Sequence, residues 1–416
     1  MRRSGFIAAS AALGASTVFS PYAIAAPGTT VTLGYLDSAS GVLSDIAGHH
    51  KIGIQIALDE ANAKGRVRWN LASGDDNSKP QTGVNEIRRL IDQERIDALI
   101  FGTSSAVALA ITPLTMQSGV FSVLLGPQDT SLSADKATAA HYRLAPDASM
   151  FTKILAQRIL ASGKKWYFII EDYAFGKDSY NRLKALLLRA GGSEVGADTY
   201  KVGTSDFSST MTKIRNTDAD QVVLCQGGLD VALAAKQFVD FGLHKRMRLA
   251  GMTLEDFYFS ALPLDQLAGS VFAAIWGPSV SPSAKRLNAS LAAKIHGPVS
   301  YRHYLGYVGA KQLIDRISAA GTTDAAKVSA AFADHTFDGY KDNPSMWRGC
   351  DHQCAQDTYA ASIVNQATFR KTGYMFDFVG TSESAQSDGT CTTPEALAAA
   401  KAIGAQKIGD REAKRL

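Results

Sequence analysis

The sequence predicts an α/β fold of two Rossmann-like lobes with parallel sheets, joined by a hinge that the chain crosses several times. Short apolar or β-branched runs alternate with amphipathic helical stretches, one unit in roughly every 25–35 residues, as strand–helix–strand units do. This alternation runs through the chain twice. A chain of 416 residues is also too long for one hydrophobic core and suits two domains.

The first 25 residues are typical of a secretory signal peptide. Arg2 and Arg3 supply positive charge, residues 6–19 are apolar or small, and residues 23–25 (Ala-Ile-Ala) match the small-x-small pattern of a cleavage site. The apolar run is too short and too rich in alanine and serine for a membrane span of ~20 apolar residues. We therefore predict an exported protein that is cleaved near Ala25, by either the general secretory or the twin-arginine route.

The strands and helices follow from hydrophobic periodicity. In the first helix Ile54, Ala57, Leu58 and Ala61 recur at the spacing of one helical face, and Gly65 is a stop signal. Continuous apolar runs predict buried parallel strands, because such strands are covered on both faces. These runs cover residues 31–36, 97–101, 120–125, 166–170, 221–225 and 271–275.

The domain division follows from the two sets of units and the breaks between them. Residues 141–146 are an extended piece that ends in proline and suits a connection between lobes. We predict that residues 26–145 and 277–346 form the first lobe, and that residues 146–276 and 347–416 form the second. Several crossings between two similar lobes are what a hinge-closing clamp needs.

Charge and missing motifs exclude several classes of function. Loss of the predicted signal peptide removes two arginines and leaves 41 basic against 39 acidic residues, a net charge of +2 with no basic stripe. Nucleic acid is therefore not an expected partner. The loop after the first strand, residues 37–41, lacks the glycine pattern of a dinucleotide site, and no phosphate loop or nucleophile elbow occurs. We predict no catalytic residue and no cofactor.

Four cysteines are present, and an exported protein can form disulfides. Cys350, Cys354 and Cys391 lie in one region, so one pair among them is expected, but the sequence does not choose which. Cys225 lies in an apolar run and is expected to be a buried hydrophobic residue. A zinc site of Cys350, His352 and Cys354 is an alternative that lacks a second ligand cluster, so no metal is predicted.

Ligands of open α/β sheets bind beyond the carboxyl ends of the strands, beside helix N-termini. In the first lobe, Ser104 and Ser105 begin a helix directly after a strand, and their hydroxyls with the free N–H groups suit a carboxylate. The alternative is that one of them is only an N-cap. Gly126 and Gln128 lie in the small, hydroxyl-rich loop after the next strand.

In the second lobe the corresponding loops carry aromatic, amide and acidic residues. Tyr173 and Phe175 follow a strand, and their rings suit the apolar part of a ligand, although one ring packing between the lobes is an alternative. Gln226 and Gly227 occupy the equivalent place after the following strand. Glu255, or Asp256 beside it, is placed to face a cationic amine, and the alternative is a solvated surface acid.

These loops together resemble the leucine/isoleucine/valine-binding family of type I periplasmic solute-binding proteins, over residues 30–380. The segment 57–65 (ALDEANAKG) looks like the family's opening helix. Also similar are the Gly-x-Ser-Ser helix start followed by Pro113, the loop 172–176 (DYAFG), and residues 205–207 (SDF) ahead of a helix. The order and spacing of these segments carry the resemblance.

The resemblance implies a periplasmic, non-enzymatic receptor that binds a small solute between its lobes and delivers it to the permease subunits of an ABC transporter. It implies that Ser104 and Ser105 hold the α-carboxylate, and that Phe175 covers the ligand. Gly126 and Gln128 match further contacts, and Glu255 or Asp256 matches the acid that takes the ammonium.

Two further segments bear on the class of solute that is expected. Residues 301–307 and 347–353 are similar to a branch of the family for which aromatic acids and other small carboxylates are plausible ligands alongside amino acids. Two other functions stay open: a solute-binding partner of a membrane sensor, and an exported α/β hydrolase, which would need a nucleophile with a histidine in reach.

Overall fold

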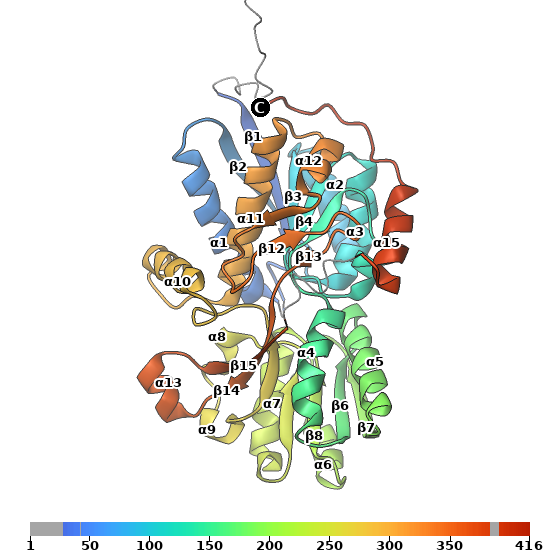
Figure 1. Ribbon diagram of the computed structural model, residues 1–416, viewed down its shortest axis with the longest axis vertical. Helices are drawn as coiled ribbons and strands as arrows, with labels where there is room; N and C mark the ends of the chain where they lie inside the picture. The colour runs from blue at the N-terminus through green and yellow to red at the C-terminus, as the bar shows by residue number, and fades with distance from the viewer. Residues whose placement is uncertain (1–27, 42, 383–390) are drawn as a thin grey trace, which may run out of the picture.

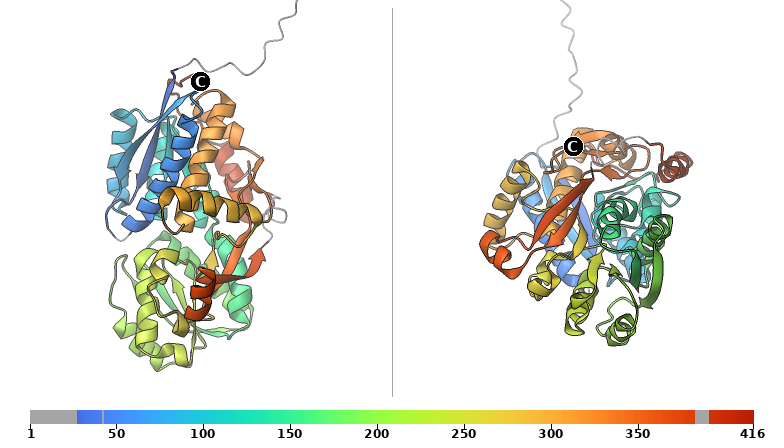
Figure 2. Two further views of the ribbon diagram at one scale, coloured as in Figure 1. Left: turned by 90° about the vertical axis from the view of Figure 1, so that its left-hand side faces the viewer. Right: turned by 60° about the horizontal axis from the view of Figure 1, so that its bottom comes forward.

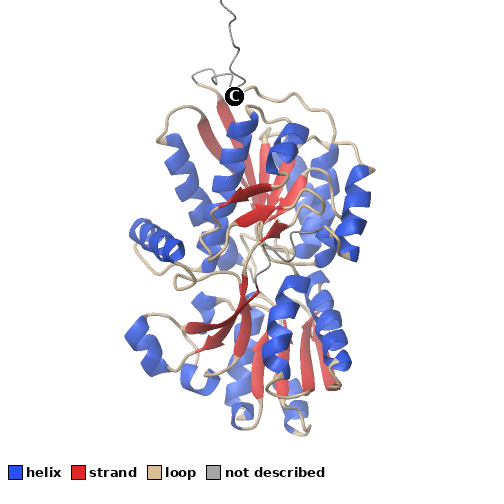
Figure 3. Cartoon of the chain, viewed as in Figure 1, coloured by secondary structure: helices blue, strands red, loops and turns tan. Residues whose placement is uncertain are grey.

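The computed structural model describes residues 28–41, 43–382 and 391–416, and the predicted signal peptide lies outside these residues. Figure 1 shows two lobes stacked along the long axis of the molecule, and the side view in Figure 2 shows that connecting segments run between them. In each lobe helices cover a central sheet (Figure 3). The predicted two-lobed α/β fold is thus confirmed. No helix within the described residues has the length and apolar character needed to cross a membrane.

The first lobe is built on a five-stranded parallel sheet with the order β2-β1-β3-β4-β5. Three of its strands overlap the predicted runs, whereas β2 was missed because it is an edge strand whose residues are mostly only partly buried. The strands are β1 (Thr30–Asp37), β2 (Arg68–Asp75), β3 (Ala98–Phe101), β4 (Phe121–Leu124) and β5 (His141–Arg143). The helices between them are α1 (Ser44–Asn62), α2 (Pro80–Asp92) and α3 (Ser105–Gln117), with the 3₁₀ turn η1 (Thr130–Ser133) after β4.

The second lobe has a seven-stranded sheet with the order β15-β14-β10-β9-β8-β6-β7. Strands β6 to β10 are parallel. The predicted runs correspond to β6, β8 and β10, whereas β7 and β9 were not predicted, and β14 and β15 add an antiparallel edge from much later in the chain. The strands are β6 (Lys165–Glu171), β7 (Ser193–Tyr200), β8 (Gln221–Cys225), β9 (Arg248–Gly251), β10 (Val271–Ala274), β14 (Thr358–Ile363) and β15 (Phe376–Ser382). Its helices are α4 (Ala148–Leu160), α5 (Ala174–Arg189), α6 (Ser208–Arg215), α7 (Gly228–Asp240), α8 (Asp256–Phe259), α9 (Leu264–Leu267) and α13 (Gln366–Thr372), with the turn η2 (Leu243–Lys245).

After β10 the chain returns to the first lobe and forms α10 (Pro282–Ile295), α11 (Tyr301–Ala320) and α12 (Ala325–Phe332). Helix α11 packs closely on α1 because glycines occupy the contact. A Cβ on Gly306 would collide with the backbone of His50, and one on Gly53 would collide with the backbone of His303. A small antiparallel sheet, β11 (His335–Phe337), β12 (Ser345–Trp347) and β13 (Cys354–Ala355), then leads back to β14. The close contact of α11 with α1 fixes the position of the first turns of α11.

The C-terminal residues correct one part of the predicted domain division. Residues 347–416 were assigned to the second lobe, but α15 (Pro394–Gly404) packs on η1 of the first lobe. Figure 1 shows α15 at the side of the upper lobe. Arg415 forms a β-bridge with Thr322, and the Lys414 ammonium pairs with the Asp97 carboxylate. The chain end thus lies against the first lobe, while the other boundaries stay a prediction.

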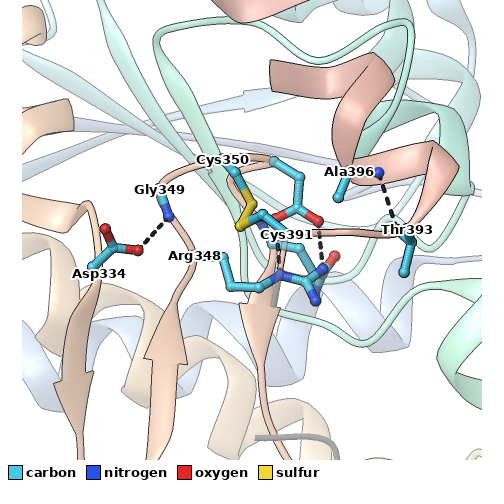
Figure 4. The surroundings of a disulfide bond; sticks show 9 residues. Asp334, Arg348, Gly349, Cys350, Cys391, Thr393 and Ala396 are labelled. Atoms are coloured by element: carbon cyan, nitrogen blue, oxygen red, sulfur yellow. Dashed lines mark hydrogen bonds and ion pairs between the residues drawn. A yellow bond between two sulfur atoms is a disulfide. The ribbon is translucent and has the colours of Figure 1, made fainter. Parts of the chain in front are cut away.

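The cysteine pairing that the sequence left open is Cys350 with Cys391, whose Cα atoms are 6.1 Å apart (Figure 4). Cys354 and Cys225 are free and buried, as expected for Cys225. The zinc alternative is wrong, since Cys350 is in the disulfide. His352 stacks on Tyr142 at 4.0 Å, and its Nδ1 lies 2.8 Å from the His141 carbonyl oxygen. No group of three or more potential metal ligands occurs among the residues that the structure describes.

Candidate ligand-binding cleft

A cleft lies between the two lobes and holds about 570 Å³ of space, part of it open to solvent. The walls combine hydroxyl groups, glycines and aromatic rings, with one acid and one cation. They are formed by Leu43, Ile46, Ser78, Thr103, Ser104, Ser105, Ala106, Gly126, Gln128, Glu171, Tyr173, Phe175, Val202, Gly227, Gly228, Thr253 and Arg302.

The N-terminus of α3 forms the polar part of the first wall. Ser104 is the N-cap, and its hydroxyl accepts a long hydrogen bond of 3.4 Å from the Val107 N–H. The Ser105 hydroxyl accepts hydrogen bonds from the N–H groups of Gln128 (3.1 Å) and Asp129 (3.3 Å). Both serines therefore have structural roles as well as a place in the wall. Further free N–H groups and the helix dipole make this end of α3 attractive to an anion.

Gly126 and Gln128 also lie in the first wall, as the sequence predicted for one shared site. Gln128 is buried, and its carbonyl oxygen accepts the Ala148 N–H at 2.8 Å, which joins the loop to the first turn of α4. A Cβ on Gly126 would lie 3.0 Å from Nη1 of Arg302. The glycine therefore leaves room for a guanidinium at the back of the cleft.

Aromatic rings form the opposite wall. Phe175 is 2% exposed and packs edge-on against Tyr173, with the ring centroids 5.9 Å apart. Gly227 precedes α7, and a Cβ there would lie 2.9 Å from the Tyr173 hydroxyl oxygen. Gln226 is fully buried and is not among the lining residues, so of the two residues predicted in this loop only Gly227 reaches the cleft.

Glu171 lines the same wall and was not selected from the sequence. Its carboxylate is 3% exposed and accepts the Gly227 N–H at 2.9 Å. Burial, and then the negative charge of Asp230, raise the pKa of Glu171 well above its ordinary value. The signal was present, because Glu171 is the first residue after an apolar run, at the carboxyl end of β6.

The two acids predicted to face an amine are engaged elsewhere and are not among the residues that line this cleft. Glu255 is fully buried and forms an ion pair with Arg302, whose Nε donates at 3.1 Å, while the Tyr301 hydroxyl donates at 3.0 Å. Asp256 accepts the Ser300 hydroxyl at 2.6 Å and the Tyr301 N–H at 3.2 Å. Burial raises the pKa of Asp256 to about 6.

Arg302 also lines the cleft and was not selected as a site residue, although it lies in the segment 301–307 that bears on the expected solute. It lies in the first turn of α11 and is 3% exposed. No short motif marks it, and its partner Glu255 lies in the other lobe. The ion pair links the lobes at the back of the cleft.

Two α/β lobes of this topology, with a polar and aromatic cleft between them, are the architecture of a solute-binding protein. The family model described as periplasmic binding protein matches residues 30–368, and the chain belongs to that family. The chain is 27% identical over 331 residues to the Leu/Ile/Val-binding protein BraC3 of Rhizobium johnstonii, covering 78% of this chain and 88% of that protein.

Solved structures share the fold. A periplasmic binding protein from Burkholderia mallei has a TM-score of 0.82 and 23% identity, covering 89% of this chain and 98% of the other. A solute-binding protein of an ABC transporter from Rhodopseudomonas palustris, solved with 3,4-dihydroxybenzoic acid, has a TM-score of 0.78 and 16% identity, covering 86% and 99%. The predicted resemblance and the fold class are therefore confirmed.

Proposed function

We propose that the chain is the periplasmic receptor of an ABC uptake transporter, which binds a small carboxylate in the cleft by hinge closure and presents it to the permease subunits. One observation carries the proposal. The N-terminus of α3, with Ser104 and Ser105, lines the same cleft as Tyr173 and Phe175 of the other lobe. One wall suits an anionic group and the other suits an apolar body.

Each lobe would contact a different part of the solute, because the two walls of the cleft belong to different lobes. The first lobe would contact the carboxylate through the α3 N–H groups and the two serines. The second lobe would close over the rest of the solute through Tyr173, Phe175 and Gly227. Closure excludes water and creates a surface spanning both lobes for the permease, so that solute binding shifts the population toward the docking-competent form.

The predicted export supports the same function. A leader of 25 residues with its cleavage site near Ala25 would deliver the receptor to the periplasm. The relatives support it through their names, since BraC3 is named for leucine, isoleucine and valine, and the Rhodopseudomonas protein was solved with an aromatic acid.

The test is a thermal-shift screen of the purified exported protein against amino acids, aromatic acids, aliphatic acids, amides and sugars. A ligand at a hundredfold excess over its dissociation constant stabilises the native state by about 2.7 kcal/mol, so a true ligand gives a clear shift. The Ser104→Ala/Ser105→Ala variant should lose that shift.

The matched control is Ser281→Ala. Ser281 is also an N-cap serine, which accepts the Ala284 N–H at 3.0 Å, but it caps α10 and does not line the cleft. It should lose a little stability and keep the ligand shift. Equal loss of the shift in both variants would show that the serines act only through folding, and no shift with any solute class would contradict the proposed function.

A further inference from the structure

Arg302 has one nitrogen that nothing in the described structure satisfies. Its Nε and Nη2 donate to the Glu255 carboxylate, whereas Nη1 is buried without a hydrogen-bond partner. A buried donor of a charged group without a partner is costly, and a bound water, ion or ligand is one way in which such a donor is satisfied. Arg302 also lines the cleft, and its buried Nη1 lies beside Gly126, another residue of the lining.

The position of Nη1 is set by its neighbours. It lies 3.0 Å from the place of a Cβ on Gly126, and that same point is 3.0 Å from the Gly102 carbonyl oxygen and 3.4 Å from the Cα of Thr103. The guanidinium therefore lies against the loop that leads into α3. A positive side chain and a helix N-terminus meet at one place, and both favour negative charge there.

The acids in and around the cleft already have partners. Glu255 is occupied by Arg302 and Tyr301 and does not line the cleft. Glu171 is the one acid among the lining residues, and burial, followed by the charge of Asp230, holds its pKa well above the ordinary value. Arg302 is the one cation among them. Because Glu171 is already bonded to the Gly227 N–H while Nη1 of Arg302 has no acceptor, the lining favours an anion over a cation.

We propose that Arg302 anchors the carboxylate of the solute through Nη1, and that the cleft selects carboxylates that carry no ammonium group. The inference rests on the proposed function and specifies its substrate class. Glu255 is then a positioning residue, which holds the guanidinium plane through two of its nitrogens and directs the third into the cleft. The rings of Tyr173 and Phe175, with Leu43 and Ile46, cover an aromatic or branched apolar body.

The experiment compares matched compounds that differ only at the charged end. Protein freed of retained solute by unfolding and refolding is titrated calorimetrically with 3-phenylpropanoate, L-phenylalanine and 3-phenylpropanamide. A second set consists of 4-methylpentanoate, L-leucine and 4-methylpentanamide. Benzoate and benzamide form an additional pair of acid and amide. We expect at least one acid to bind about tenfold or more tightly than its amino-acid and amide counterparts, because a charged hydrogen bond is lost or an unpaired ammonium is buried.

Three results would overturn the inference: an amino acid that binds more tightly than its deaminated acid, an amide that equals its acid, or no binding of any acid. These results leave the proposed function standing if an amino acid, an amide or a sugar binds in the cleft. If no solute of any class binds, the proposed function fails as well.

Variants test the anchor itself. Arg302→Gln alone would leave the Glu255 carboxylate buried without its cation, so the informative variant is Arg302→Gln/Glu255→Gln, in which two neutral amides can still pair. Its affinity for the preferred acid should fall about ten- to hundredfold, with less effect on the matching amide. The control is Arg286→Gln, which removes an exposed arginine from α10 and should not change the affinity. Full affinity for the acid in the double variant would overturn the role of Arg302.

Discussion

The Tyr258 hydroxyl, in the second lobe, donates a 2.8 Å hydrogen bond to the Asp45 carboxylate at the start of α1 in the first lobe. A second link between the lobes lies beside η1, where the Asp178 carboxylate accepts the Thr130 N–H at 3.0 Å and the Thr130 hydroxyl at 2.7 Å. Together with the Arg302–Glu255 pair, these bonds hold the lobes together around the cleft. They form only when the lobes are close, so they contribute to the free energy of closure.

The Tyr258→Phe variant should bind solute about two- to tenfold more weakly, because it removes one bond of the closed form that is worth roughly 0.5–1.5 kcal/mol. Calorimetric titration of the ligand found in the screen would measure the change. The control is Tyr374→Phe, at an exposed tyrosine outside this cleft, which should bind normally. Unchanged affinity in Tyr258→Phe would mean that the Tyr258–Asp45 bond does not contribute to closure.

Gly126→Ala should lower the affinity for solute more than it lowers stability. The added methyl group would lie 3.0 Å from Nη1 of Arg302 and would displace the guanidinium or fill the space beside it. Gly297→Ala is the matched control, because a Cβ there has nothing within 4 Å. Titration and thermal melts of both variants separate binding from folding, and normal binding by Gly126→Ala would count against the anchoring role of Arg302.

Asp76→Asn should stabilise the protein at alkaline pH. Burial, and then the charge of Asp37, raise the pKa of Asp76 to about 7. Because the native pKa is above the unfolded one, the stability from this group is present at low pH and is lost as the pH rises through 7. The Oδ1 atom of asparagine can still accept the hydrogen bonds from the Ser38 hydroxyl (2.6 Å) and the Ser78 N–H (2.7 Å). Its amide nitrogen replaces Oδ2, which has no hydrogen-bond partner in the aspartate.

Urea unfolding at pH 5 and pH 8 measures this effect, and the gain over the parent should be greater at pH 8 by about 2 kcal/mol. Asp75→Asn is the control, because the pKa of this neighbouring carboxyl is shifted in the opposite direction. Burial acts to raise the pKa of Asp75, but hydrogen bonds from Ser40 and the Asn77 N–H outweigh it and lower the pKa. That variant should lose stability at pH 8, and an equal response of both variants would refute the assignment.

The Cys350→Ser/Cys391→Ser variant should be less stable by about 3–4 kcal/mol, since the disulfide closes a loop with a sequence separation of 41 residues. Thermal melts with and without reductant measure the loss, and reductant should affect only the parent protein. A parent whose melting does not respond to reductant would speak against a structural disulfide.

Thiol labelling should find no reactive cysteine in the native protein. Cys225 and Cys354 are buried, and burial raises the pKa of the Cys354 thiol to about 12. Iodoacetamide followed by mass spectrometry should therefore add no label under native conditions, two labels after unfolding, and four after unfolding with reduction. Labelling of the native protein would contradict the buried placement of these residues.

Hydrophobic runs were enough to predict six of the buried parallel strands and the doubling of the α/β pattern, because parallel strands covered on both faces read as continuous apolar segments. Edge strands were not predicted, because they are less buried and lack such a continuous apolar segment. β7 has no fully buried residue, so its sequence lacks the run that marks β8. The antiparallel strands β14 and β15 join the second sheet from far along the chain, and periodicity carries no information about which sheet a strand joins.

The sequence by itself determined which loops meet at the cleft. Residues such as Ser105, Gly126 and Phe175 follow the carboxyl ends of parallel strands, and that local rule brings them to one edge of each sheet. Only the tertiary structure decided what Glu255 faces. Its partner Arg302 comes from α11, after the chain has crossed to the other lobe, and their ion pair exists only when the lobes are together. The pairing of Cys350 with Cys391 and the return of residues 414–416 to the first lobe were decided in the same way, because contacts between distant segments depend on how the lobes and their helices pack.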